Sequence, residues 1–218
     1  DSVRRIEAFY DDLLRHDVRP LTIGGDHTLS LPILRAMAKK HGPLALLHID
    51  AHADINSHMF GEEIAHGTPF RRAFEEGLLD ADNVFQIGLR GTGYTAEDFD
   101  WASERGFQVV QAEQLWHQSA APLMDQIRQQ IGARPVYLSF DIDSLDPAYA
   151  PGTGTPEIGG LTSIQALEII RGCRGLSLVG ADLVEVSPPY DTNGNTALLA
   201  ANLLFEMLCV LPGVAYRD

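Results

Sequence analysis

The sequence predicts an α/β fold in which a mostly parallel β-sheet carries helices on both faces. Short apolar runs rich in β-branched residues alternate with longer amphipathic stretches, and this alternation is typical of parallel sheets. The runs are apolar almost throughout, as in strands that are buried on both faces. The 218 residues suit a single domain, 1–218, and no internal repeat or linker divides them.

Six apolar runs are the candidate strands, and five longer stretches are the candidate helices. We expect the strands at 20–23, 44–49, 84–89, 107–111, 136–140 and 176–186. We expect the helices at 3–16, 32–41, 121–132, 163–172 and 197–209.

The composition excludes several classes of protein. Sixteen Lys and Arg stand against thirty Asp and Glu, a net charge of −14, which disfavours a nucleic-acid partner. The longest apolar stretch, 197–211, contains Asn202 and Glu206 and is too short to span a membrane, so we expect a buried helix. Cys173 and Cys209 form no C-x-x-C motif, and no signal peptide is visible, so a cytoplasmic location is expected.

Polar residues follow three of the predicted strands, where ligands bind in folds of this class. Asp50, His52 and Asp54 occupy alternate positions after strand 44–49, so an extended backbone points all three to one side. Asp141 and Asp143 follow strand 136–140 with the same spacing. Gly-Gly-Asp-His (24–27) follows strand 20–23.

Taken singly, each of these residues has a structural explanation. A strand-end Asp is often a turn or cap residue, and a His can be a hydrogen-bonded core residue, which is the role we assign to His48. Four Asp at one sheet edge, however, would repel one another strongly unless a cation neutralised them. Few basic residues lie in these motifs, so we expect metal ions.

The types of ligand and their charge indicate which ions, and how many. Carboxylates and imidazoles without a thiolate favour Mn²⁺ or Mg²⁺ over a structural Zn–Cys site. Two divalent ions would balance four carboxylates, and ions roughly 3.5–4 Å apart can share a water and lower its pKa. The sequence therefore predicts a two-metal hydrolytic site.

Three motifs resemble the metal-binding motifs of the ureohydrolases, the arginase/agmatinase family. They are Gly-Gly-Asp-His (24–27), Asp-Ala-His-Ala-Asp (50–54) and Ser-Phe-Asp-Ile-Asp-Ser-Leu-Asp-Pro (139–147), and segments 150–157 and 184–188 fit as well. The motifs run in the family's order along essentially the whole chain. The resemblance implies a three-layer αβα sandwich and attack of a metal-bridging hydroxide on a guanidinium carbon, which releases urea and an amine.

The resemblance also implies a ligand set of two Mn²⁺ per chain. One ion would be held by His27, Asp50, Asp54 and Asp141, and the other by His52, Asp50, Asp141 and Asp143. Asp50 and Asp141 would thus bridge the two ions, and Asp54 counts among the catalytic residues as well.

Two further residues gain catalytic and substrate-binding roles from the resemblance. Glu185 would accept hydrogen bonds from the planar guanidinium, a match of bidentate geometry, although a charged residue at a strand edge or end is the plain alternative. His66 would relay a proton to the departing amine, although it could also be an ordinary loop histidine. Both assignments are hypotheses.

The tail of the substrate distinguishes the branches of the family. Segments 56–72, 87–101 and 203–213 look most similar to the guanidinobutyrase branch, which converts 4-guanidinobutyrate to 4-aminobutyrate. His58, Arg90 and Tyr94 could then meet the carboxylate and Met59 the alkyl chain, although each could be a surface or packing residue. Agmatinase activity, which yields putrescine and urea from agmatine, is the first alternative, followed by guanidinopropionase and formimidoylglutamase.

The chain departs from the family pattern at its start. Only 23 residues precede the Gly-Gly-Asp-His motif, whereas family members usually carry a much longer segment there. We therefore expect the first strand or two of the family's sheet to be missing, because the sequence is either partial or truncated. The apolar C-terminal helix and the family's habits favour a homo-oligomer, commonly a trimer or hexamer.

Other classes of protein explain fewer of these features. Gly91, Gly93 and Ala96 match the G-x-G-x-x-A pattern of dinucleotide-binding proteins, but the residues that follow are acidic. A deacetylase-like amidohydrolase or a phosphoesterase could use the same metals, although Glu185 favours a cationic substrate over a phosphate. A non-catalytic, metal-stabilised assembly subunit is the remaining alternative.

Overall fold

The sheet has six strands, and every neighbouring pair is parallel. The computed structural model describes residues 1–91 and 100–215, and within them the strand order is β1-β6-β5-β2-β3-β4. The strands are β1 Leu21–Ile23, β2 Leu44–Ile49, β3 Leu79–Leu89, β4 Gln108–Gln111, β5 Pro135–Asp141 and β6 Ser177–Val184. All six predicted strands are present, and β3 begins earlier than predicted.

The described residues also form six α-helices. They are α1 Ser2–Leu13, α2 Ser30–His41, α3 Pro69–Glu75, α5 Ala121–Ile131, α6 Ser163–Gly172 and α7 Asn195–Val210. Five short 3₁₀ helices accompany them: η1 His27–Leu29, η2 Ser103–Arg105, η3 Ala112–Leu115, η4 Ile142–Ser144 and η5 Pro188–Tyr190. Helix α3 was not predicted from the sequence, because its seven residues are too few to show a helical period.

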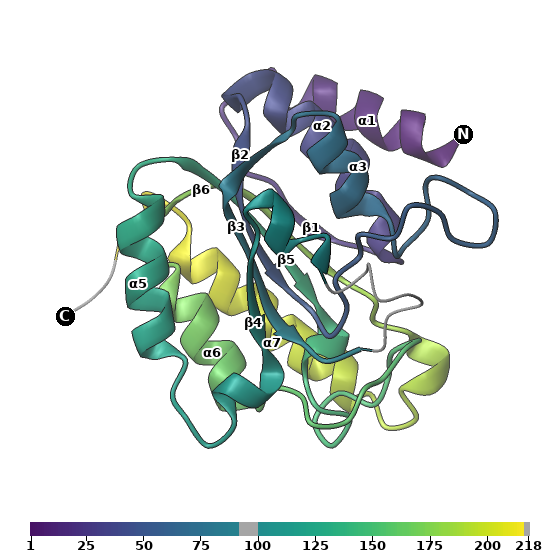
Figure 1. Ribbon diagram of the computed structural model, residues 1–218, viewed down its shortest axis with the longest axis vertical. Coiled ribbons are helices and arrows are strands. Elements are labelled where there is room, and N and C mark those ends of the chain that lie inside the picture. The colour runs from purple at the N-terminus through teal and green to yellow at the C-terminus, as the bar shows by residue number, and fades with distance from the viewer. Residues whose placement is uncertain (92–99, 216–218) are drawn as a thin grey trace.

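The helices form a layer on each face of the sheet, so the predicted three-layer αβα arrangement is confirmed (Figure 1). Leu44 and Leu46 of β2 pack in the core beneath α1, α2 and α3. Ala45, Leu47 and Ile49 pack in the opposite core, beneath α5, α6 and α7. All six residues of β2 are buried, which explains why its sequence is a continuous apolar run rather than an alternating one.

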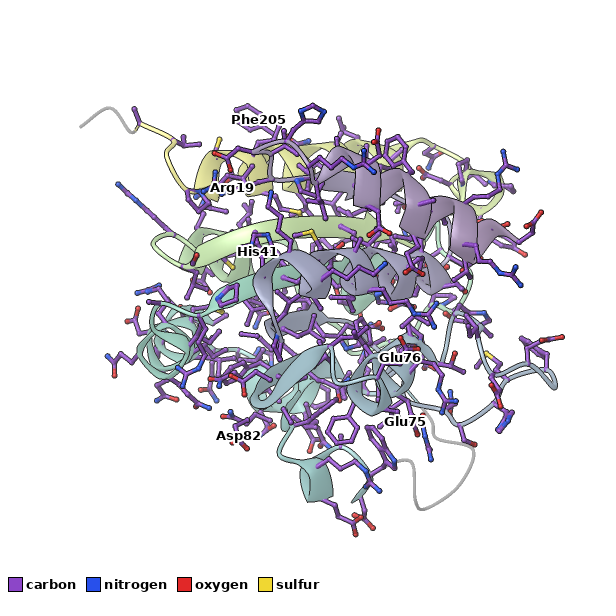
Figure 2. All side chains as sticks on the ribbon, turned by 90° about the horizontal axis from the view of Figure 1, so that it is seen from above. Arg19, His41, Glu75, Glu76, Asp82 and Phe205 are labelled. Atoms are coloured by element: carbon purple, nitrogen blue, oxygen red, sulfur yellow. The ribbon has the colours of Figure 1, made fainter. Side chains whose placement is uncertain are left out.

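Helix α7 is only partly buried, which corrects the prediction of a buried helix. Leu203, Leu204 and Met207 belong to the core, whereas Leu198 and Phe205 are each 64% exposed. Figure 2 shows Phe205 at the surface of the molecule. Across the described residues, none of the helices combines the length and the apolar character needed to cross a membrane.

One glycine lets strand β3 pass close to the backbone of Asp50, at the end of the neighbouring strand β2. Gly88 of β3 has φ +101°, and a Cβ added there would lie 3.0 Å from the backbone oxygen of Asp50. The pairing of β3 with β4 also shifts between Ile87 and Leu89, as at a β-bulge.

We expect Gly88→Ala to destabilise the protein by about 1–3 kcal/mol more than Gly175→Ala. Both substitutions force alanine to a similar positive φ, but Gly175 (φ +91°) has open space around its Cα. The difference therefore isolates the clash with Asp50. Urea unfolding of both variants measures it, and equal losses would contradict the steric explanation.

Candidate metal centre

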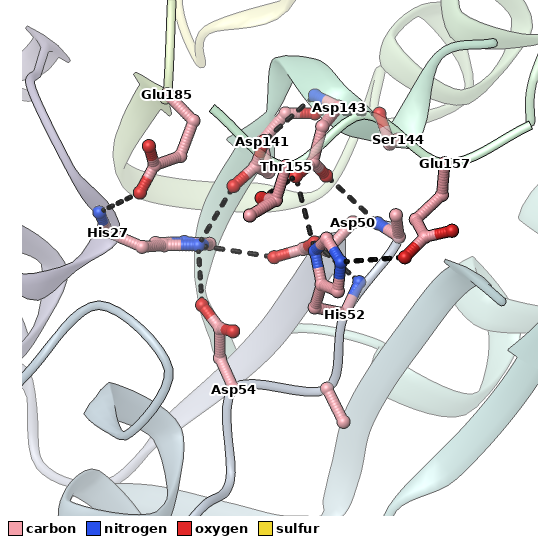
Figure 3. A network of polar contacts seen from close by, with 12 residues as sticks. His27, Asp50, His52, Asp54, Asp141, Asp143, Ser144, Thr155, Glu157 and Glu185 are labelled. Atoms are coloured by element: carbon pink, nitrogen blue, oxygen red, sulfur yellow. Dashed lines mark hydrogen bonds and ion pairs between the residues drawn. The ribbon is translucent and has the colours of Figure 1, made fainter. Parts of the chain in front are cut away.

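Six polar side chains converge at the carboxyl edge of the sheet (Figure 3). They are the six predicted metal ligands His27, Asp50, His52, Asp54, Asp141 and Asp143. Strands β2 and β5 are neighbours in which Ile49 pairs with Phe140, so the residues that follow these two positions emerge side by side.

Each motif folds into a local turn that its own aspartate stabilises. Asp50 Oδ1 accepts a hydrogen bond from the backbone N–H of His52 at 2.7 Å. Asp141 Oδ1 accepts one from the backbone N–H of Asp143 at 2.8 Å, which caps η4. These carboxylates therefore act as turn caps, as a single strand-end Asp would, and also take part in the cluster.

The contacts form two groups that share Asp50. His27 Nδ1 lies 2.9 Å from Asp54 Oδ2, 3.1 Å from Asp50 Oδ2 and 3.3 Å from Asp141 Oδ2. His52 Nδ1 lies 3.2 Å from Asp143 Oδ2 and 3.5 Å from Asp50 Oδ1. The two oxygens of Asp50 thus face different histidines, which suits a carboxylate that bridges two ions.

Hydrogen bonds assign the tautomer of His27. Its Nε2 lies 2.8 Å from Ser139 Oγ, and the Ser139 hydroxyl donates to Asp182 Oδ1 at 2.6 Å. Because that hydroxyl proton is committed to Asp182, His27 Nε2 must be the donor to Ser139. In the neutral imidazole, Nδ1 is then a bare lone pair, and it is a buried atom without a hydrogen-bond partner.

The charges around this nitrogen favour a cation. Burial opposes protonation of His27, but the carboxylates of Asp141, Asp50 and Asp54 that face its Nδ1 raise its pKa well above the ordinary value. Burial raises the pKa of Asp141, and so do the nearby charges of Asp143 and Asp50. These oxygen and nitrogen donors, which include no thiolate, fit hard or borderline divalent metal ions.

A cavity of about 680 Å³ opens beside the cluster. Of the residues predicted to act in catalysis or substrate binding, Asp54, Met59, His66, Arg90 and Glu185 line it. Tyr94, which was also predicted to bind substrate, lies outside the described residues.

His58 lies away from this lining. Its side chain is 57% exposed, and its Nε2 is 3.7 Å from Glu63 Oε1 in the same loop. The structure therefore does not bring His58 together with the other predicted side chains of the cavity.

Glu185 lies immediately after β6, which ends at Val184 rather than at 186 as predicted. Its backbone is left-handed, with φ +64°. Glu185 Oε1 accepts a hydrogen bond from the backbone N–H of His27 at 2.7 Å. Burial raises the pKa of Glu185 to about 7, although that hydrogen bond opposes the shift. The carboxyl group is thus held at the wall of the cavity, beside the metal cluster.

The contacts of Arg90 favour a structural role over the predicted contact with a substrate carboxylate. Its guanidinium donates to six backbone carbonyl oxygens, those of Gly88, Asp143, Ser144, Leu145, Glu157 and Ile158. Arg90 therefore joins the end of β3 to the turn after β5 and to the cavity wall. Burial lowers its pKa.

Gly91 has a packing role at the cluster. A Cβ at this position would lie 2.4 Å from Cδ2 of His52, so the glycine lets the chain pass the imidazole closely. The rest of the glycine-rich pattern, with Gly93 and Ala96, lies outside the described residues.

Several residues that support the site were not predicted from the sequence. Ser139 and Asp182 hold His27, as described above. Thr155 Oγ1 donates to Asp143 Oδ2 at 3.1 Å, and Glu157 Oε1 lies 3.7 Å from His52 Nε2. Thr155 and Glu157 lie within the quoted segment 150–157, but only the folded chain brings them next to the ligands.

We expect Arg90→Lys to destabilise the protein by about 2 kcal/mol or more, because an ammonium group cannot reach the same set of carbonyls and leaves some of them unpaired. Arg134→Lys is the control. Arg134 also donates to backbone carbonyls, but its side chain is 50% exposed, and a loss below about 0.5 kcal/mol is expected. Urea unfolding compares the two, and similar small losses would argue against the structural role.

Comparison with known proteins places this geometry in a family. The arginase family model matches residues 1–209. Guanidinobutyrase of Pseudomonas aeruginosa is 70% identical over 217 residues, which are 100% of this chain and 68% of that protein. Human mitochondrial guanidino acid hydrolase is 62% identical over 214 residues, which are 98% of this chain and 61% of that protein.

A solved structure agrees with these relatives. Proclavaminate amidino hydrolase from Streptomyces clavuligerus superimposes with a TM-score of 0.88 at 43% identity, over 94% of this chain and 69% of that chain. The present chain therefore spans between 61% and 69% of the length of these three proteins. The motifs, the sheet and the cluster of ligands have a common explanation: the chain belongs to the arginase family.

Proposed function

We propose that this chain is a metal-dependent hydrolase domain, 1–218, that cleaves a linear guanidino compound into urea and an amine. The observation that carries the proposal is the buried, unpartnered Nδ1 of His27, which faces three carboxylate oxygens. This arrangement is unfavourable without a cation, and it lies beside a cavity that holds a further carboxylate, Glu185. Membership of the arginase family supports the same chemistry.

The ligand sets would hold two Mn²⁺. One set consists of His27, Asp50, Asp54 and Asp141, and the other of His52, Asp50, Asp141 and Asp143. When bound, such an ion pair supplies the Lewis acidity that activates water near neutral pH. The chain's own contribution is to hold Asp50 with one oxygen toward each histidine.

The guanidinium head of the substrate would bind at Glu185. A carboxylate and a guanidinium match in planar geometry and in charge, and Glu185 lines the cavity within reach of the cluster. His66 lines the same cavity, and we propose that it passes a proton to the departing amine. Asp54 would serve as a ligand that also faces the substrate.

The preferred substrate would be 4-guanidinobutyrate. The guanidinobutyrase of Pseudomonas aeruginosa, at 70% identity, supports this choice. Met59 lines the cavity, and a Cβ added at Gly67 would lie 2.4 Å from its Cε, so Met59 packs closely over Gly67 and would offer an apolar wall to the alkyl chain. His58 and Tyr94 stay predictions for the carboxylate end, and Arg90 is left out because backbone carbonyls occupy its donors.

Three further features stay predictions from the sequence: the assembly into a trimer or hexamer, the cytoplasmic location and the choice of Mn²⁺ as the native ion. The exposed apolar side chains of α7, including Phe205 and Leu208, are compatible with an assembly.

A urea-release assay with Mn²⁺ tests the proposal on 4-guanidinobutyrate, guanidinopropionate, agmatine and arginine. We expect the largest kcat/KM for guanidinobutyrate and loss of activity after chelation, because the ligand cluster needs a cation. A larger kcat/KM for agmatine would move the assignment to the agmatinase alternative. If the folded, metal-loaded protein releases no urea from any of them, the enzymatic assignment is wrong.

Glu185→Gln tests the proposed role of this carboxylate. We expect turnover to fall by about 100-fold or more, because the amide loses the charge that pairs with the guanidinium, while metal content stays unchanged. Glu206→Gln on the surface of α7, where Glu206 pairs with Arg171, is the control and should keep wild-type turnover. Steady-state kinetics and metal analysis measure both, and full activity of Glu185→Gln would refute the role.

A further inference from the structure

A row of buried polar side chains crosses the sheet one layer below the metal cluster. Gln86 of β3, His48 of β2, Ser139 of β5 and Asp182 of β6 pair with one another in register. All four are 0% exposed. Because alternate residues of a strand share a face, His48 lies below Asp50 and Ser139 below Asp141.

The Gln86 amide determines the tautomer of His48. Gln86 Nε2 lies 2.7 Å from the backbone oxygen of Ala53 and 3.0 Å from His48 Nδ1. A carbonyl oxygen only accepts, so the amide atom facing Ala53 must be the nitrogen, and its second hydrogen points at His48. His48 Nδ1 is therefore an acceptor, and the proton of the neutral ring lies on Nε2.

This Nε2–H donates to the carboxylate that both groups of ligands share. His48 Nε2 lies 2.7 Å from Asp50 Oδ2, while Asp50 Oδ1 accepts from the backbone N–H of His52. The two donors hold the carboxylate plane so that Oδ2 faces His27 and Oδ1 faces the ring of His52. The His48 ring is itself packed against Phe70, with centroids 4.1 Å apart.

The same contacts argue against His48 as a metal ligand. Its ring nitrogen lies within 4.8 Å of the ligand atoms of His27, Asp50 and Asp54, a spacing that could hold an ion. However, Nε2 carries a proton directed at Asp50, and Nδ1 faces Gln86, so neither nitrogen offers a free lone pair. His48 is thus neither a ligand nor merely a core residue.

We propose that His48 is a positioning residue that orients Asp50 for metal binding, and that Gln86 sets the tautomer which allows this. The inference rests on the proposed metal centre. Hydrogen-bonding partners of this kind orient ligands and raise metal affinity, and their removal typically costs roughly 10–100-fold in affinity.

Two substitutions of His48 separate hydrogen bonding from packing. His48→Phe keeps an aromatic ring against Phe70 but removes the donor to Asp50. His48→Gln restores an N–H directed at Asp50 and a carbonyl oxygen that can accept from Gln86. We expect Mn²⁺ affinity, measured by calorimetry on the whole protein, to fall about 10–100-fold in His48→Phe and to stay within about threefold of wild type in His48→Gln.

Gln86→Glu tests the tautomer with almost no change in volume. The carboxylate removes the donor to His48 Nδ1 and favours a proton on that nitrogen. His48 Nε2 would then carry no proton and could no longer donate a hydrogen bond to Asp50. Mn²⁺ affinity should fall as in His48→Phe. Gln165→Glu is the matched control, because Gln165 is buried and its amide also donates to backbone carbonyls, those of Leu115 and Gln118, away from the cluster. It should leave Mn²⁺ affinity unchanged.

Electron paramagnetic resonance of the Mn²⁺-loaded variants provides a second readout. We expect a spin-coupled signal in wild type and in His48→Gln, and weaker coupling in Gln86→Glu, because a turned Asp50 would leave Asp141 as the one carboxylate shared by both ligand sets. The proposal is overturned if Gln86→Glu keeps wild-type affinity and coupling, or if His48→Gln loses as much affinity as His48→Phe. Should His48→Phe fail to fold, the comparison of His48→Gln with Gln86→Glu decides. Absence of Mn²⁺ binding by wild type would remove the metal centre itself.

Discussion

The concentration of negative charge at one edge of the sheet is the constraint on which the rest of the structure depends. Asp50, Asp141 and Asp143 are almost fully buried, and Asp54 is 8% exposed. Like charges at this depth repel one another, and turn-capping hydrogen bonds to single backbone N–H groups compensate only part of that cost. The residues around the cluster are arranged to hold these carboxylates, and bound cations would supply the remaining stabilisation, which would couple folding to metal binding.

Backbone geometry helps to aim the carboxylates. Asp54 and Glu185 have positive φ values, +51° and +64°, and such conformations cost of order 1 kcal/mol or more for residues with a side chain. Hydrogen bonds hold both in place: the carbonyl of Asp54 accepts from the N–H of Phe70, and the N–H of Glu185 donates to the carbonyl of Gly25. Two of the residues that face the cavity thus carry strain that their surroundings maintain.

Two kinds of support surround the cluster. Arg90 joins backbone segments that are distant in sequence, because its partly buried guanidinium binds their carbonyl oxygens. The polar row beneath the ligands, from Gln86 to Asp182, acts on side chains instead. It assigns Nε2–H to both His27 and His48, although His27 has its bare nitrogen toward the carboxylates of the cluster and His48 its proton toward Asp50. The same tautomer therefore serves two different roles, according to the side from which each ring meets the carboxylates.

The sequence by itself determined the class of fold, the strands and the polar residues that gather at the edge of the sheet, because apolar runs and alternating polar residues at strand ends depend only on local periodicity. The alternation of Asp50, His52 and Asp54 already implied a common direction for these side chains. The tertiary structure decided the contacts of Arg90, His48 and Gln86. From the sequence alone, Arg90 is a candidate for substrate binding and His48 an ordinary core residue. The folded chain surrounds Arg90 with carbonyl oxygens, and the register of β2 and β3 places Gln86 beside His48. Pairing between strands distant in the chain has no local signal, so only the assembled sheet specifies such contacts.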